Sequence, residues 1–297
     1  MHKNKPRLRK IIVSLIFLLP AFAFLSYSVY IPFGWNIVLS FQNWDGFLKK
    51  SWAGLANYFN AFHDPEVLKA LGNSIFLALV STLGSVLLGV LAAGLLFKVR
   101  RGEGAFYRLI IFMPVMLPSA IVGLLFTFVF NADIGLLNSF FRAVGLGSLT
   151  KAWLENYSTV MWCIAFVNIW KMTGLTMMLV FAAIQMLPVS IFESSKIDGA
   201  SYPKQFFYLT LPLVKSIIQL STVYILAVCF KTYDIVFSMT RGGPGIASTT
   251  IPITMIKTAF LFGEFGYSSA MGIILMLIVV VLVLTFNKLL SGEKYEF

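Results

Sequence analysis

The sequence is poor in side chains that do chemistry near neutral pH. Its two histidines are His2 and His63, and its two cysteines, Cys163 and Cys229, lie singly in apolar runs. A single thiol in an apolar run usually acts as a small apolar group. No HExxH motif, paired-cysteine motif or GxxxxGK[ST] loop is present. We therefore expect no catalytic residue, metal site or bound cofactor, and a chain that does not hydrolyse ATP by itself.

Composition excludes an ordinary soluble enzyme and a disordered chain. A soluble domain carries about 25% charged residues, whereas this chain of 297 residues has 12% charged and 59% hydrophobic residues. Its 23 Lys and Arg exceed its 12 Asp and Glu, which gives a formal net charge of +11. Either a nucleic-acid partner or the positive-inside orientation of a membrane protein explains such an excess, and the positions of the charges decide between them.

Six stretches are long and apolar enough to cross a bilayer, which takes about 18 or more residues. They cover 11–33 with an aromatic extension to 41, 70–97, 109–130, 156–192, 216–230 with an extension back towards 206, and 265–287. Lys171 interrupts the fourth stretch, which is long enough to hold two short segments. The sequence therefore predicts an all-α membrane protein with six transmembrane helices.

The basic residues orient these spans. With the N-terminus inside, the dense clusters at 3–10 and 98–108 are both cytoplasmic, as the positive-inside bias requires. Both termini are then cytoplasmic, and no nucleic-acid partner is needed to explain the charge. A cleaved signal peptide is the alternative for the first span, but the apolar run continues well past the small-residue site at 21–23, beyond the usual length of such a segment.

The loop between the fourth and fifth spans, 189–212, combines several features of a docking segment. If 189–197 is helical, Glu193 and Ile197 lie one turn apart on one stripe. The small residues Ser194 and Ser195 allow close approach of another protein, and Gly199 is a plausible helix stop. A solvated loop between helices is the alternative interpretation.

This loop resembles the EAA loop of ABC-importer membrane subunits, and is most similar to that of the maltose-type carbohydrate-uptake permeases. The matching positions are Glu193, Ser194, Ser195, Gly199 and Pro212, together with the segment Ile197-Asp198-Gly199-Ala200. Further matching segments are Gln42-Asn43-Trp44, Ala56-Asn57-Tyr58-Phe59, Phe112-Met113-Pro114 and Thr240-Arg241-Gly242-Gly243-Pro244. Both alanines of the EAA pattern are serines here.

The resemblance implies the type I ABC importer transmembrane fold and a domain plan. It gives a basic cytoplasmic tail (1–10), a peripheral first helix (11–41), an external loop (42–69), an importer core (70–287) with its coupling loop (189–212), and a cytoplasmic tail (288–297). The coupling residues would be Glu193, Ser194, Ser195, Asp198, Gly199 and Ala200. The implied partners are a second homologous permease, two cytoplasmic ATPase subunits that use the ATP, an extracytoplasmic sugar-binding protein and membrane lipid, all in a prokaryotic plasma membrane.

Polar residues inside spans are costly and therefore suggest a substrate path. Those of the fourth span are Asn168, Trp170, Lys171 and Thr173, and those at the end of the fifth are Cys229, Lys231, Thr232 and Asp234. In the maltose-type family these stretches line the sugar cavity. The alternatives are a helical pair of Lys231 with Asp234, a packing role for Trp170, and an ion pair of Lys171 with another subunit, because we identify no carboxylate of this chain at matching depth.

The expected substrate is an oligosaccharide or disaccharide. Lysines near the path also permit an anionic substrate, such as a uronate oligosaccharide or glycerol phosphate. A stand-alone channel or secondary transporter is a further alternative, but we find no internal repeat, and it leaves the coupling loop unexplained. A membrane-embedded enzyme would need buried His or acidic clusters, which the sequence lacks.

Overall fold

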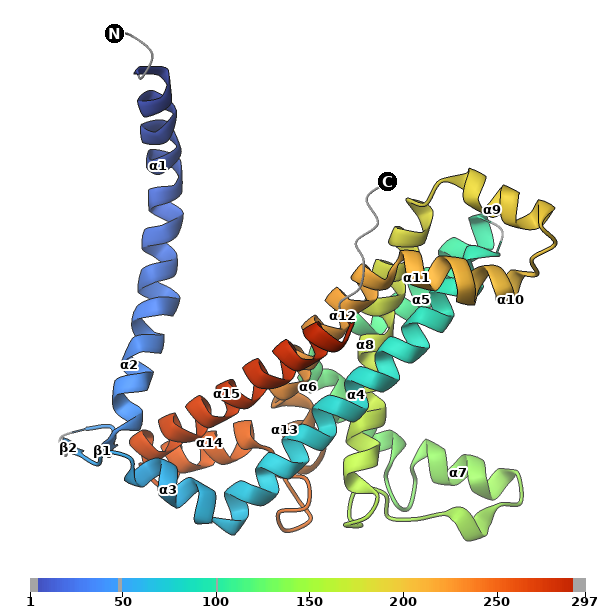
Figure 1. The fold of residues 1–297 in the computed structure, drawn as a ribbon. Helices are drawn as coiled ribbons and strands as arrows, with labels where there is room; N and C mark the ends of the chain where they lie inside the picture. Colours follow the sequence, from blue (N-terminus) through green and yellow to red (C-terminus); the bar gives the residue numbers. More distant parts are fainter. Residues whose placement is uncertain (1–4, 48–49, 100, 291–297) are drawn as a thin grey trace. The chain divides into compact units, whose positions relative to one another are not determined.

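The computed structural model describes residues 5–47, 50–99 and 101–290 (Figure 1). The helices, in chain order, are α1 (Lys5–Leu25), α2 (Ile31–Ser40), α3 (Ala56–His63), α4 (Pro65–Phe97), α5 (Arg101–Met116), α6 (Ser119–Val129), α7 (Leu136–Ala143), α8 (Val160–Gln185), α9 (Val189–Ile197), α10 (Tyr202–Gln205), α11 (Leu211–Leu213), α12 (Lys215–Phe230), α13 (Asp234–Thr240), α14 (Ile251–Phe260) and α15 (Phe265–Leu290). One antiparallel hairpin, β1 (Gln42–Trp44) and β2 (Lys50–Trp52), completes the described secondary structure with short π and 3-10 segments. Most of the tail predicted at 288–297, and the start of the tail at 1–10, lie outside the described residues.

The chain divides into two compact units. The first comprises 1–63 and 255–274, and the second comprises 64–254 and 275–297. In the first unit, a nearly continuous helix over Val13–Ser40 exposes most of its apolar side chains, and only its last turn is buried, at Leu39 and Ser40. The buried Asn57 side chain donates hydrogen bonds to the carbonyl oxygens of Ser40 and Gln42, both at 3.0 Å. Asn57 thereby fixes α3 against the end of α2 and the start of the hairpin.

The second unit is built on two long helices, α4 and α8, that pack side by side (Figure 1). Gly89 of α4 makes this possible, because a Cβ atom there would lie 2.8 Å from the Thr173 carbonyl oxygen and 2.9 Å from the Met177 nitrogen. Small residues at helix contacts allow the backbones to approach closely. Helix α12 packs against both α4 and α8, and α5 packs against α8.

The helical membrane architecture predicted from hydropathy is confirmed in its coarse form. Four helices are each long and apolar enough to cross a membrane: Val13–Ser40, Pro65–Phe97, Val160–Gln185 and Phe265–Leu289. Two bent pairs, Gly102–Met116 with Ser119–Val129 and Tyr202–Leu213 with Lys215–Phe230, raise the number to six if each pair is one span. The described residues thus give four to six spans, and the side on which the termini lie stays a prediction.

The stretch predicted at 109–130 is not one straight helix. It bends by 102° between α5 and α6, at Leu117 and Pro118. Proline lacks a backbone N–H and disfavours the helical conformation of the residue before it, which explains the break. The stretch at 156–192 holds one span, α8, because Gln185 ends the helix and Pro188 opens the separate helix α9.

Candidate functional site

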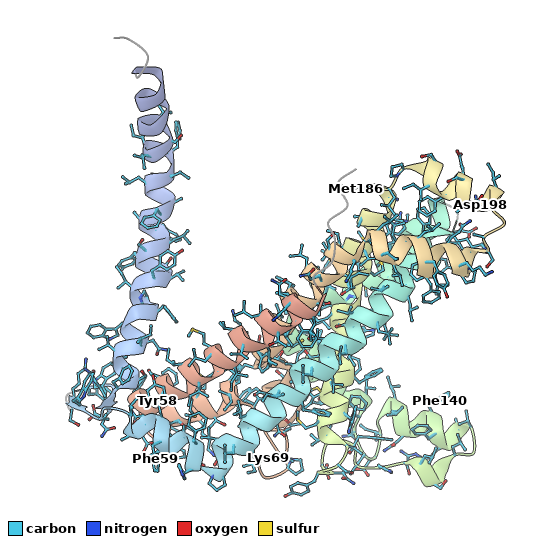
Figure 2. The ribbon with its side chains drawn as sticks, in the orientation of Figure 1. Tyr58, Phe59, Lys69, Phe140, Met186 and Asp198 are labelled. Carbon is cyan, nitrogen blue, oxygen red and sulfur yellow. The ribbon has the colours of Figure 1, made fainter. Side chains whose placement is uncertain are left out.

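Helix α9 forms the segment that the sequence predicts to couple the chain to another protein. Figure 2 labels Met186 and Asp198 at the two ends of this segment, and Figure 1 shows that α9 and α7 lie at opposite ends of α8 within the second unit. Pro188 is the N-cap of α9, and its carbonyl accepts the first backbone hydrogen bond, from Ile191 at 3.2 Å. The proline suits this position because it needs no hydrogen-bond partner for its nitrogen.

The C-terminus of α9 is closed by a Schellman motif. The N–H of Ala200 donates to the Ser195 carbonyl at 2.9 Å, and that of Gly199 donates to the Lys196 carbonyl at 3.0 Å. Gly199 has a φ of +76°, the left-handed conformation that this motif requires and that glycine adopts without penalty. The helix stop predicted at Gly199 is therefore confirmed, and it turns the chain sharply towards α10.

The residues predicted to couple this chain to the ATPase subunits differ in their exposure. Glu193, Ser194, Asp198 and Gly199 are exposed. Ser195 is instead 7% exposed, and its hydroxyl donates to the Phe192 carbonyl at 2.9 Å. Ala200 is half-buried. Ile197 is 87% exposed, so the outer face of α9 presents a carboxylate and a bare apolar side chain one turn apart.

Contacts that the sequence did not single out hold this loop to the end of α4. The Tyr202 hydroxyl donates to the Gly94 carbonyl, and the rings of Phe97 and Phe192 lie 5.4 Å apart. A Cβ atom on Gly94 would lie 2.4 Å from the ring of Phe206. These contacts join α9 and α10 to α4.

Lys171, in the middle of α8, has polar partners within this chain. Its side chain is 5% exposed, and its Nζ atom donates a hydrogen bond to the Ser119 Oγ atom at the start of α6. The carboxylate of Asp234 also interacts electrostatically with the Lys171 ammonium. The sequence did not identify this carboxylate as a neighbour of Lys171. The fold brings Asp234 towards Lys171, although 62 residues separate the two positions in the sequence.

Close packing of α6 against α13 brings these groups together. A Cβ atom on Gly123 would lie 2.8 Å from the Ser238 Cβ atom and 3.1 Å from the Ile235 carbonyl oxygen. Ser119 and Gly123 are four residues apart on α6, which is the spacing of a small-residue helix contact. From this spacing, the sequence can predict that α6 packs closely against another helix and forms one wall of the site.

The other predicted residues of the fourth span have different environments. Trp170 packs edge-on against Phe126 of α6, with ring centroids 5.3 Å apart. The Asn168 side chain is 1% exposed and donates to the Ile164 carbonyl at 3.3 Å. The Thr173 hydroxyl donates to the carbonyl of Ile169 at 2.7 Å. Trp170 and Lys171 thus both meet α6, while Asn168 and Thr173 hydrogen-bond within α8.

At the end of the fifth span the chain leaves the helix. Cys229 is 2% exposed and belongs to the apolar core, while Lys231 and Asp234 are exposed and Thr232 is half-buried. Because α12 ends at Phe230 and α13 begins at Asp234, Lys231 and Asp234 do not share one helix. The pairing by helical spacing that we considered for them does not apply.

Asn73 is a further important residue that the sequence did not indicate. Its side-chain amide is 6% exposed and donates to the carbonyl oxygens of Ile246, Ala247 and Thr249 at 3.4, 3.0 and 2.8 Å. It thereby fixes to α4 the loop that follows residues 240–244, a segment that resembles the maltose-type permeases. In the part of the chain that the structure describes, no group of three or more His, Cys, Asp and Glu side chains is placed to hold a metal ion.

Comparisons with known proteins agree with this geometry. Residues 85–292 match the family model of the binding-protein-dependent transport system inner membrane component. The chain is 37% identical to the probable ABC transporter permease protein YurN of Bacillus subtilis (strain 168), over 96% of this chain and 98% of that protein. It is 32% identical to the diacetylchitobiose uptake system permease protein NgcF of Streptomyces coelicolor, over 99% of this chain and 88% of that protein.

A solved structure shares the fold. One chain of a bacterial alginate ABC transporter, in complex with an alginate pentasaccharide-bound periplasmic protein, matches with a TM-score of 0.83 and 19% identity. The match covers 97% of each chain. The family model matches most of the sequence, and the relatives are permease subunits rather than enzymes. The chain is therefore a multi-pass membrane protein that belongs to the family of binding-protein-dependent transport system inner membrane components.

Proposed function

We propose that this chain forms half of the channel of an ATP-driven sugar importer. A second homologous permease would complete the channel, and an external binding protein would deliver an oligosaccharide or disaccharide. Two separate ATPase subunits would hydrolyse ATP and dock on the coupling loop. Relatives that include a diacetylchitobiose permease support a sugar-type substrate, and the alginate transporter captured with its periplasmic protein supports delivery by a binding protein.

The observation that carries this proposal is the exposed outer face of α9. Glu193 and Ile197 present a charge and an apolar side chain to another protein, and Gly199 ends the helix so that the chain returns to α10. Because α10 and α9 are fixed to α4 through Tyr202 and Phe192, closure of two ATPase subunits would move membrane helices. The chain supplies a helix bundle with alternative packings, and the ATPases supply the energy.

The contacts of Lys171 favour an uncharged sugar over an anionic substrate. The ammonium donates to Ser119 and lies within electrostatic reach of the Asp234 carboxylate, so partners in this chain reduce its need for an anionic group on the substrate. The aromatic face of Trp170 nearby suits the apolar face of a sugar ring. We assign Trp170, Lys171 and Thr173 to one side of the path, and Lys231, Thr232 and Asp234 to its outer end. Asn168 and Cys229 are buried among the helices, so we leave them out of the path.

The decisive experiment is the ATPase activity of the assembled complex in lipid, with binding protein loaded with neutral or uronate oligosaccharides. We expect stimulation by a neutral ligand and its loss in Glu193→Lys. Glu103→Lys is the matched control, because Glu103 is also exposed and acidic but lies on α5 outside the coupling loop. Stimulation by only the uronate ligand contradicts the neutral-sugar assignment.

Two further outcomes would contradict the proposal itself. If no ATPase subunit co-purifies with the chain, the coupling role of α9 is wrong, and a stand-alone channel or secondary transporter becomes the better interpretation. If a Lys171→Ala importer transports its sugar at the normal rate and with the normal substrate preference, Lys171 does not line the path. Uptake of labelled sugar into proteoliposomes measures both rate and preference.

A further inference from the structure

A pocket of about 930 Å³ lies behind the coupling loop. Its walls come from the end of α4, from α5, from the end of α8, and from α9 and α10. All of its lining residues belong to the second unit. Glu193 and Ile197 do not line it, so the pocket is separate from the outer face of α9 that the proposed function assigns to the ATPase.

The polar part of the pocket is cationic. Lys98, Arg108 and Lys196 line it, and no Asp or Glu does. Among the residues that the structure describes, none of these three cations has an ion-pair partner. Two of them lie instead over aromatic rings of the same pocket: the Arg108 guanidinium is 4.6 Å from the Phe181 ring centroid, and the Lys98 ammonium is 5.4 Å from that of Tyr202.

The rest of the lining is mainly apolar and includes Phe181, Phe192 and Ile184. The pocket thus combines three cations that have no ion-pair partner among the described residues with an apolar wall at the ends of membrane helices. A free phosphate ion needs only the cations, whereas an amphiphile with an anionic head needs both surfaces. Basic pockets between membrane helices on the cytoplasmic side are suited to anionic lipid headgroups.

We propose that this pocket binds an anionic phospholipid, with the phosphate between Lys98, Arg108 and Lys196 and the start of an acyl chain against the apolar wall. The inference rests on the cytoplasmic position that the proposed function gives to the coupling loop. Because Lys196 is on α9 and the ring of Phe192 faces the pocket, a bound lipid would stabilise one position of the loop. The lipid would then link membrane composition to coupling.

The test is native mass spectrometry of the intact purified chain with phosphatidylglycerol or with phosphatidylcholine. We expect retention of phosphatidylglycerol and weaker retention of phosphatidylcholine. Each charge removed should weaken binding about fivefold, so Lys98→Gln with Arg108→Gln should weaken it about 25-fold. Arg108→Lys keeps the charge and should retain the lipid. Lys204→Gln is the matched control, because Lys204 is an exposed cation of α10 that does not line the pocket.

Equal retention of the two lipids, or equal loss in Lys204→Gln and in the double variant, would overturn the proposal. Displacement of bound phosphatidylglycerol by inorganic phosphate alone would show a free-phosphate site and would overturn the lipid assignment. The measurement needs no ATPase, no binding protein and no sugar. A failure of the lipid proposal is therefore distinguishable from a failure of the proposed importer function.

Discussion

The Nζ atom of Lys171 donates a hydrogen bond to the Oγ atom of Ser119, across the contact between α8 and α6. Ser119 is the first residue of α6, directly after the bend at Leu117 and Pro118. The bend therefore places the Ser119 hydroxyl opposite the buried Lys171 ammonium. A straight helix over the same residues would place this hydroxyl elsewhere. A charge inside a membrane protein must be paired or hydrated, and here the break in the third apolar stretch supplies a partner.

Removal of the Ser119 hydroxyl should therefore destabilise the fold through Lys171. We expect Ser119→Ala to lower the free energy of unfolding by about 1.5–3 kcal/mol, the usual contribution of a hydrogen bond to a charged group. In Lys171→Met the ammonium is absent, so the additional loss from Ser119→Ala should be much smaller. Denaturant unfolding of the four proteins in detergent gives the coupling energy directly. Simple additivity of the two losses would show that the hydrogen bond contributes nothing to stability.

Asn73 provides a second test, because the effect of an aspartate at this position on stability depends on the direction of the hydrogen bonds. Its amide donates to three carbonyl oxygens of the 246–249 loop. Asn73→Asp replaces the donor by a carboxylate against those carbonyls, so it should destabilise the chain more than Asn73→Ala, which should cost about 1–3 kcal/mol. The thermal unfolding midpoint of the purified protein measures this order.

The matched control for Asn73 is Asn131→Asp. The Asn131 side-chain oxygen accepts from the N–H groups of Asp133 and Ile134, both at 3.0 Å, and a carboxylate can accept the same bonds. We expect Asn131→Asp to leave the unfolding midpoint nearly unchanged. If Asn73→Asp is as stable as the natural chain, the three hydrogen bonds of Asn73 do not hold the loop.

The sequence predicted local structure best where one short signal decides it. The helix expected at 189–197 is α9 with the same bounds, and Gly199 ends it, because glycine adopts the left-handed conformation of a helix stop at little cost. Hydropathy likewise identified the apolar stretches, because burial in lipid depends on composition over about 20 residues.

The partners of the site residues could not be predicted in the same way. Hydropathy carries no information about the direction of a helix axis, so it could not predict the 102° bend before Ser119. Asp234, the first residue of α13, comes near Lys171 where Gly123 lets α6 and α13 pack closely. Such contacts join segments that are distant in the sequence and depend on helix packing rather than on local preference. The small-residue spacing of Ser119 and Gly123 was the one available signal.

Gly199 should be sensitive to substitution for a backbone reason alone. Its φ is +76°, and a Cβ atom there would have no atom within 4 Å, so any penalty comes from the left-handed conformation. We expect Gly199→Ala to cost about 1–2 kcal/mol and Gly199→Asn to cost less, since asparagine tolerates this conformation better. The unfolding midpoint and the ATPase stimulation of the assembled complex should both fall more in Gly199→Ala than in Gly199→Asn.

The control for Gly199 is another glycine with free space. Gly102 lies in α5, and a Cβ atom there would also have no atom within 4 Å. Because alanine is favoured over glycine in a helix by up to about 1 kcal/mol, Gly102→Ala should be neutral or slightly stabilising. Equal effects of Gly199→Ala and Gly102→Ala would mean that the turn after α9 does not need its left-handed residue.

Gly174 tests the contact between α5 and α8, where space rather than backbone conformation is limiting. A Cβ atom there would lie 2.3 Å from the Ile111 carbonyl oxygen and 2.8 Å from the Phe112 Cα atom. Both are backbone atoms, so the two helices must separate to admit a methyl group, and packed interiors resist such expansion. We expect Gly174→Ala to cost about 1–3 kcal/mol or more and to lower the yield of folded protein. Gly72→Ala, on α4 with nothing within 4 Å of its Cβ position, should have little effect. A Gly174→Ala protein with the yield and unfolding midpoint of Gly72→Ala would show that α5 and α8 do not pack this closely.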